Sequence, residues 1–168
     1  MIELKSSGES EALGEAGRVV AAALAAVRDH ASVGVRLDEL DDVARSVIVG
    51  AGARPSFLDY HPSWAPTPFP GIICTSVNDA VVHGIPNRRR LVEGDLVSID
   101  CGAHLNGWCG DAAVSFIVGD KNPDETDVRL IEATSEALAA GITAARPAPD
   151  WVTSHTPSAH SPANAVTD

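Results

Sequence analysis

Apolar residues recur every three or four positions in three stretches of the chain, a spacing that is typical of amphipathic helices. The first stretch covers residues 7–30 and follows Ser6 and Glu9, which have the spacing of a helix-capping box. The second covers residues 37–50, and the third covers residues 122–147, with a proline at its first helical position. We therefore predict three helices, and the short link between the first two predicts an αα-hairpin.

The middle of the chain has the texture of short strands, because runs of β-branched and apolar residues alternate with turn residues. The Asn106–Gly107 pair is a strong signal for a two-residue hairpin turn. Helices on both sides of a group of antiparallel strands indicate an α+β fold, in which helices cover one face of the sheet. We predict strands in GIICTSV (71–77), AVVHG (80–84), LVSIDCG (96–102) and AAVSFIVG (112–119).

Two segments lack any helix or strand period. Residues 55–70, PSFLDYHPSWAPTPFP, contain five prolines and four aromatic residues, which excludes a regular helix or a central strand. Two interpretations stay open for this segment: a proline-stiffened surface loop and the wall of a substrate pocket. Residues 148–168 are rich in Pro, Ser, Thr and Ala, and we expect them to form a disordered tail.

Composition and charge exclude some classes of partner, but they do not define the function. The chain has 168 residues, 45% of them hydrophobic, which is enough for one domain with its own core. Its net charge of −11 argues against a nucleic acid or an anionic membrane as a partner. Three cysteines without a CxxC spacing favour reduced thiols, and the first residues lack the apolar run of a signal peptide. We therefore expect a cytoplasmic protein without a membrane span.

Asp100 and Asp111 stand inside the predicted hairpin, although strand interiors disfavour aspartate. Side chains alternate between the two faces of a strand, so the apolar residues of both strands can share a core only if the two aspartates share the other face. Depending on the turn, they lie directly opposite each other or, in the Asn-Gly register, on a diagonal. Two such carboxylates suit a divalent cation, whereas a solvated face with weakly repelling charges is the alternative.

Three blocks of the sequence carry more specific motifs: AGARPSFLDY (51–60), VNDAVVHGIP (77–86) and EGDLVSIDCGAHLNGWCGDAAVSFIVG (93–119). Together with the predicted N-terminal helices, they resemble the type I methionine aminopeptidases of the pita-bread metallopeptidase family. The resemblance covers about residues 3–147. It implies that residues 1–147 form the first half of a pita-bread catalytic domain and that residues 148–168 are an unrelated tail.

The resemblance implies a dinuclear metal site that removes the initiator methionine from nascent proteins. Asp100 and Asp111 match the family's first two metal ligands, of which Asp111 would bridge both ions. Two divalent ions (Co, Mn, Fe or Zn) would activate the water that attacks the carbonyl after the methionine. His83 matches the histidine that contacts the substrate beside the scissile bond and stabilises the tetrahedral intermediate. Without the resemblance, His83 is more simply read as a structural histidine.

The same resemblance places Tyr60, Phe69 and Cys74 in the pocket for the methionine side chain. An apolar wall that contains sulfur suits a thioether. The HPSWAPTP loop (61–68) is longer than in many members, so ordinary loop packing is the alternative for Tyr60 and Phe69, whereas Cys74 is anchored by the ICTSVN motif. No metal role is expected for the packing residues Cys101 and Cys109, for the solvent-facing Glu132 and Glu136, or for His155 and His160 in the tail.

The family's remaining ligands, one histidine and two glutamates, come from a second half whose motifs do not occur in these 168 residues. We therefore expect weak metal binding by two carboxylates, an exposed sheet edge, and little activity unless a second polypeptide completes the site. The alternative function is a non-catalytic fragment, or a module that binds N-termini around Cys74 and His83. A creatinase-like relative that does not cleave peptides is disfavoured, because such relatives often lack the metal carboxylates.

Overall fold

The computed structural model describes residues 4–119, 121 and 123–145. The chain divides into two compact units, one ending at Gly119 and one beginning at residue 120. The expectation of a disordered tail over residues 148–168 lies outside the described residues. Among the described helices, none is long and apolar enough to span a membrane.

Two helices open the first unit, as predicted. Helix α1 spans Ser7–His30 and begins with the expected capping box, in which the Ser6 hydroxyl accepts from the Glu9 amide and the Glu9 carboxylate accepts from the Ser6 amide. Helix α2 spans Leu37–Gly50 and packs against α1, which confirms the αα-hairpin. The chain turns between them at Gly34, where φ is +93°.

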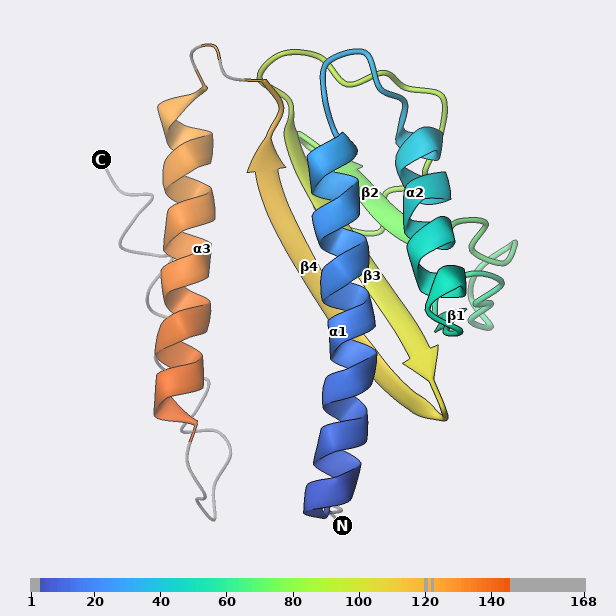
Figure 1. Ribbon diagram of the computed structural model, residues 1–168. Coiled ribbons are helices and arrows are strands. Elements are labelled where there is room, and N and C mark those ends of the chain that lie inside the picture. Colours follow the sequence, from blue (N-terminus) through green and yellow to red (C-terminus); the bar gives the residue numbers. More distant parts are fainter. Residues whose placement is uncertain (1–3, 120, 122, 146–168) are drawn as a thin grey trace. The chain divides into compact units, whose positions relative to one another are not determined.

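The sheet of the first unit is antiparallel and is built around one long strand (Figure 1). Strand β3, Leu96–Leu105, pairs along one side with β4, Trp108–Ile117, and along its other side with β2, Ile73–Val77, and with the two-residue β1, Arg54–Pro55. Within the described residues, the outer edge of β4 has no strand partner. The sequence pattern did not indicate β1, which is short and lies next to the proline-rich segment.

The β3–β4 hairpin is longer than predicted, because pairing continues to Leu105 and Trp108. Asn106 and Gly107 form its two-residue turn, with φ values of 52° and 87°. Both residues are therefore in the left-handed region, as a type I′ turn requires, and an Asn-Gly pair adopts that region at low cost. This turn fixes the register of every residue pair along the hairpin.

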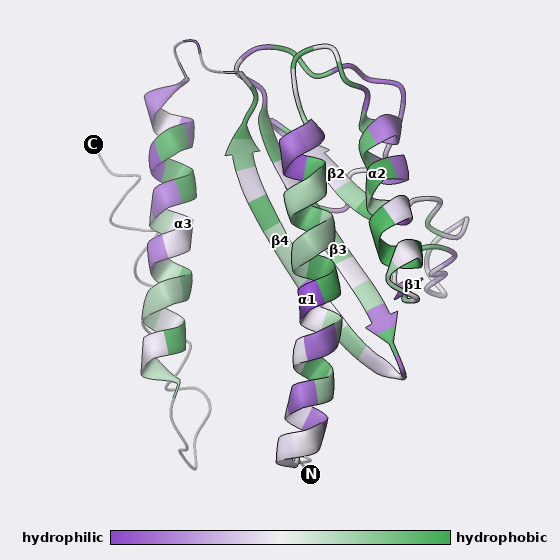
Figure 2. Cartoon of the chain, viewed as in Figure 1, coloured by the Kyte–Doolittle hydropathy of each residue, from purple (hydrophilic) through white to green (hydrophobic). Residues whose placement is uncertain are grey.

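The core lies on one face of the sheet, beneath α1 and α2. Helix α1 packs against β3 and β4, and α2 packs against β1 and β2. Val97, Ile99 and Cys101 of β3 are fully buried on this face, as the alternation predicted. Figure 2 shows the hydropathy alternating along β3 and β4, which is the pattern of strands with one buried face.

A buried carboxylate joins the second helix to the start of β2. Asp41 of α2 accepts hydrogen bonds from the backbone amides of Ile72 and Ile73 at 2.6 and 3.1 Å, both through Oδ1. Arg45 lies one turn further along the helix, with its guanidinium 3.7 Å from Oδ2. Burial raises the pKa of Asp41 above its ordinary value, against the opposing effect of the two amide donors.

The predicted strand AVVHG, residues 80–84, is wrong, because these residues form a loop. His83 has a φ of 57°, which breaks an extended conformation. Gly84 then crosses β2: its carbonyl accepts from the Thr75 amide at 2.7 Å, and its amide donates to the Ser76 hydroxyl at 3.2 Å. The apolar Val81 and Val82 are exposed, so their β-propensity had no partner strand to satisfy.

The described part of the second unit is one helix, α3, spanning Glu125–Ala144. The helix begins later than the predicted range of residues 122–147, and Pro123 is not its first helical residue. Asp124 is the N-cap, and its carboxylate accepts from the amide of Thr126 at 2.7 Å. Glu132 and Glu136 are exposed on this helix, as expected.

Candidate metal and substrate site

Asp100 and Asp111 lie on the same face of the sheet, opposite the face covered by α1 and α2. In the hairpin register, Asp100 pairs with Ala113 and Asp111 pairs with Gly102. The two carboxylates are therefore diagonal neighbours, which is the arrangement predicted for an Asn-Gly turn. Cys74 of β2 pairs with Asp100 from the other side, so all three side chains belong to this face.

The absence of a side chain at Gly102 leaves room beside Asp111. A Cβ atom at this position would lie 3.0 Å from Oδ2 of Asp111 and 2.9 Å from the Cβ of Ser56. Both contacts are tighter than side chains normally tolerate. Because Gly102 has no side chain, the Asp111 carboxylate can lie above β3, and the segment that follows β1 can lie close to the strand.

The electrostatics of Asp100 show that the two carboxylates interact. Burial raises the pKa of Asp100 above its ordinary value, and the negative charge of Asp111 raises it further, while His83 acts in the opposite direction. A cation between the two carboxylates would act against both effects, because a nearby positive charge favours the charged form of each carboxylate. The donors fit a divalent metal ion in kind, since both are hard oxygen ligands. They do not complete a site, since the described residues contain no cluster of three or more His, Cys, Asp or Glu side chains suited to a metal.

His83 is held by the loop between β2 and β3 rather than by a strand. The two ends of this loop meet at the buried Asp95, whose Oδ1 accepts from Asn78 Nδ2 at 2.9 Å and from the Arg89 guanidinium at 3.1 Å. Asp95 Oδ2 also accepts from the Val92 amide at 2.9 Å. Asp95 therefore fastens both ends of the loop, and Gly84 fastens its middle to β2.

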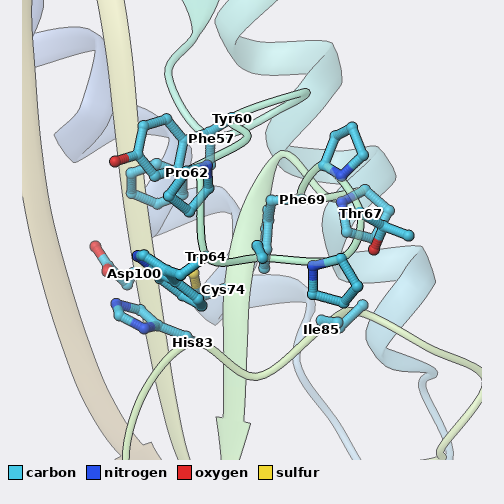
Figure 3. Close-up of a pocket in the computed structure, with 14 residues that line it drawn as sticks. Phe57, Tyr60, Pro62, Trp64, Thr67, Phe69, Cys74, His83, Ile85 and Asp100 are labelled. Carbon is cyan, nitrogen blue, oxygen red and sulfur yellow. The ribbon is translucent and has the colours of Figure 1, made fainter.

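A cavity of about 450 Å³ brings the predicted site residues together (Figure 3). It is lined by Tyr60, Phe69, Cys74, His83 and Asp100, so one of the two carboxylates and all four predicted substrate-binding residues share it. Asp111 is not part of its lining. The 55–70 segment supplies one wall, which supports the pocket-wall interpretation of this loop.

The sequence reasoning did not single out several other lining residues. The aromatic and proline content marked the whole 55–70 segment as a candidate pocket wall, but the sequence contains no signal that distinguishes its individual lining positions. Ile85 follows the histidine in the HGIP motif and could have been found from that position. The lining residues not predicted are Phe57, Pro62, Trp64, Ala65, Pro66, Thr67, Pro68, Pro70 and Ile85.

Part of the cavity wall is formed by apolar side chains. Phe57 and Phe69 pack edge to face, with ring centroids 6.5 Å apart. Cys74 is 5% exposed, and burial followed by the charges of Asp100 and Asp111 raises its pKa to about 12, so the thiol stays neutral. Among the other cysteines, Cys101 is buried in the core as predicted, whereas Cys109 is exposed and does not pack there.

Comparison with known proteins identifies the fold and the family. The model of metallopeptidase family M24 matches residues 11–156. The chain belongs to this family. A crystal structure of methionine aminopeptidase from Rickettsia prowazekii superposes with a TM-score of 0.77 at 35% identity, covering 84% of this chain and 54% of that one. Prolidase from Pyrococcus furiosus, at 21% identity and a TM-score of 0.80, shares the fold. The expected α+β half of a pita-bread fold is thereby confirmed.

Relatives within M24 carry the name methionine aminopeptidase. Methionine aminopeptidase 1 of Mycobacterium tuberculosis is 51% identical over 145 residues, which are 86% of this chain and 52% of that protein. Methionine aminopeptidase 1 of Bacillus subtilis is 42% identical over 147 residues, which are 88% of this chain and 56% of that protein. The chain therefore spans about half the length of the curated relatives it matches.

Proposed function

We propose that this chain forms the first half of a methionine aminopeptidase that removes the initiator methionine from nascent proteins. The observation that carries the proposal is that one cavity is lined both by Asp100, a carboxylate suited to a metal ion, and by His83 and apolar residues. The M24 membership and the methionine aminopeptidase relatives support the same reaction. The three free cysteines fit a location in the cytoplasm.

Each part of the site has a role in this proposal. Asp100 and Asp111 would hold divalent metal ions, which supply a Lewis acid and lower the pKa of bound water. Tyr60, Phe69 and Cys74 would hold the methionine side chain, because a neutral thiol and aromatic rings suit a thioether. His83 would donate a hydrogen bond to the oxygen of the scissile carbonyl as its negative charge develops.

We further propose that the described half-site binds metal weakly and turns over little substrate by itself. Affinity for a divalent ion depends on the number of ligands and on how well they are preorganised. Two carboxylates on one sheet face provide few ligands, and the matched relatives are about twice as long. A complementing polypeptide that supplies further ligands would then be required for full activity.

The metal part of the proposal is tested by calorimetric titration of the purified chain with Mn²⁺. Asp100→Asn and Asp111→Asn should each weaken binding about tenfold or more, since each removes a charged oxygen ligand. Asp42→Asn is the matched control, because it removes the same charge from an exposed position on α2. Equal affinities in Asp100→Asn and Asp42→Asn would rule out the carboxylate site.

The reaction is tested by measuring release of methionine from a Met-Ala peptide in the presence of Mn²⁺, Co²⁺ or Fe²⁺. We expect slow or undetectable release. Robust release that Asp111→Asn abolishes would contradict the half-site proposal and leave the aminopeptidase assignment intact. Peptide binding without any release of methionine, even after a complementing polypeptide supplies further metal ligands, would favour the alternative of an N-terminus-binding module.

A further inference from the structure

A histidine and a cysteine lie opposite each other near the turn of the β3–β4 hairpin. His104 of β3 and Cys109 of β4 are register partners, one pair before Leu105 and Trp108 reach the turn. Residues directly opposite each other in an antiparallel pair have Cβ atoms about 4.5–5.5 Å apart, and their side chains point to the same face. Cys109 lies two residues before Asp111 on β4, so the pair belongs to the cavity face of the sheet, although neither residue lines the cavity.

The hydroxyl of Ser56 lies between these two side chains. Its Oγ atom forms a hydrogen bond with Nδ1 of His104 at 2.8 Å and lies 3.7 Å from Sγ of Cys109. Ser56 is itself held against β3, because its backbone amide donates to the Gly102 carbonyl at 3.0 Å. The imidazole nitrogen and the sulfur therefore both turn toward one point beside the hairpin.

The two donor atoms suit a metal ion of a different kind from the one expected at the carboxylates. Thiolate and imidazole are preferred by thiophilic ions such as Zn²⁺, Cd²⁺ and Cu⁺, whereas Mn²⁺ and Mg²⁺ prefer carboxylate oxygens. A zinc ion lies about 2.3 Å from a cysteine sulfur and about 2.1 Å from a histidine nitrogen. Rotation of the two side chains about their own bonds would bring both donors onto one ion.

The pair is open to solvent and has charges of both signs beside it. Cys109 is an exposed free thiol, and His104 is half-buried. Asp111 adds negative charge on one side, whereas Arg54, the register partner of His104 on β1, adds positive charge on the other. In the described part of the chain, no third His, Cys, Asp or Glu completes a set of ligands. Affinity must therefore come from the metal–sulfur bond, which favours a thiophilic ion.

We propose that His104 and Cys109 form a second metal site, which binds thiophilic ions such as Zn²⁺ and Cd²⁺ outside the cavity. Water or the Ser56 hydroxyl completes the coordination of the ion. The ion replaces the thiol proton of Cys109, and this proton passes to solvent. An ion held by both strands ties β3 to β4 beside the turn, so its binding stabilises the folded hairpin. The site does not depend on the proposed function.

The test is a titration of the purified chain with Cd²⁺, followed by the ultraviolet absorption of sulfur-to-metal charge transfer. This absorption arises only from ions bound through a thiolate, so ions at Asp100 and Asp111 do not contribute. We expect the wild type to give the signal and Cys109→Ser to abolish it. Cys74→Ser is the matched control, because Cys74 is the buried cysteine of the same face, and it should keep the signal. A wild type without the signal, or a signal that survives in Cys109→Ser, would overturn the proposal.

A second pair of variants separates a two-ligand site from a cysteine that binds Cd²⁺ alone. His104→Ala should weaken binding about tenfold or more, since it removes one of two protein ligands. His104→Gln keeps a group that can bond to the Ser56 hydroxyl and should weaken binding to a similar extent. Unchanged affinity in both variants would overturn the proposal, because the thiol alone would then account for binding.

Thermal melts give a readout that does not rely on absorption by sulfur. Cd²⁺ should raise the melting temperature of the wild type by more than that of Cys109→Ser, because only the wild type can hold an ion between the two strands. The same melts without metal show that each variant is folded. Equal shifts in the two proteins would contradict a site that joins β3 to β4.

Discussion

The two faces of β3 have opposite environments although their residues alternate one by one along the strand. Ile99 points into the core beneath the helices and is fully buried, and its neighbour Asp100 points to the other face beside a cavity. On the helix-covered face, apolar burial supplies the stability. On the cavity face, a partly buried carboxylate lies near a second one and carries a raised pKa. The comparison shows that one strand can stabilise the fold and hold an electrostatically unfavourable site at the same time.

The largest effect is expected on the helix-covered face. Ile99→Ala should lower the free energy of unfolding by about 3–4 kcal/mol, because the side chain is completely buried and its removal leaves a cavity. Urea denaturation monitored by circular dichroism measures this loss. Ser98→Ala is the neighbouring control on the other face, where the Ser98 hydroxyl bonds Ser115 at 2.7 Å and is worth about 1 kcal/mol. Equal losses for the two variants would contradict the assignment of the faces.

The next effect concerns the loop that carries His83 to the cavity face. Asp95→Ala should cost about 3 kcal/mol, because it removes a buried carboxylate with three hydrogen-bond donors. Hydrogen exchange should accelerate first in residues 78–89. Asp95→Asn keeps one acceptor and should have a smaller effect. Exchange that stays slow in this loop after Asp95→Ala would show that Gly84 holds His83 without help from Asp95.

Asp41 tests the junction of the helices with the sheet. Asp41→Ala should cost about 2 kcal/mol, because two buried backbone amides lose their acceptor. Asp41→Asn keeps an acceptor oxygen and removes the buried charge. Since the folded pKa is raised above 3.8, the charged form is disfavoured by folding, and the wild type loses stability relative to Asp41→Asn as pH rises through that raised value. Chemical denaturation of both proteins from acidic to neutral pH measures the difference between their free energies of unfolding. We expect this difference to shift in favour of Asp41→Asn as the pH rises, and a shift in favour of the wild type would contradict the prediction.

The smallest effect is a gain in stability, and we expect it on the cavity face. Without metal, Asp100→Asn should raise the melting temperature slightly, because burial and the charge of Asp111 both disfavour the carboxylate. With Mn²⁺ in excess, the wild type should gain more than the variant, since binding to the folded state stabilises it. Thermal melts with EDTA and with Mn²⁺ provide both values. A wild type that is the more stable protein in EDTA would contradict the electrostatic contrast between the two faces.

Several elements were predictable because their signals are local. The capping box marked the first helix, and the Asn106–Gly107 turn set the hairpin register that makes Asp100 and Asp111 diagonal neighbours. The strand predicted for residues 80–84 is wrong, because their strand propensity competes with contacts that form only after folding. Gly84 forms hydrogen bonds with Thr75 and Ser76 of β2, and these contacts cannot be deduced from the residues next to Gly84 in the sequence.

The sequence by itself determined the helices, the hairpin and the side of the sheet to which each of its residues points, because helix caps, turn residues and alternation act over a few residues. Only the tertiary structure decided that Trp64 of the proline-rich loop stands beside His83 and Asp100 at one cavity. The physical reason is that these residues come from separate loops and a strand, and packing alone brings them together. The hairpin register alone sets the relative positions of the two carboxylates, whereas the pocket forms only when the whole first unit is folded.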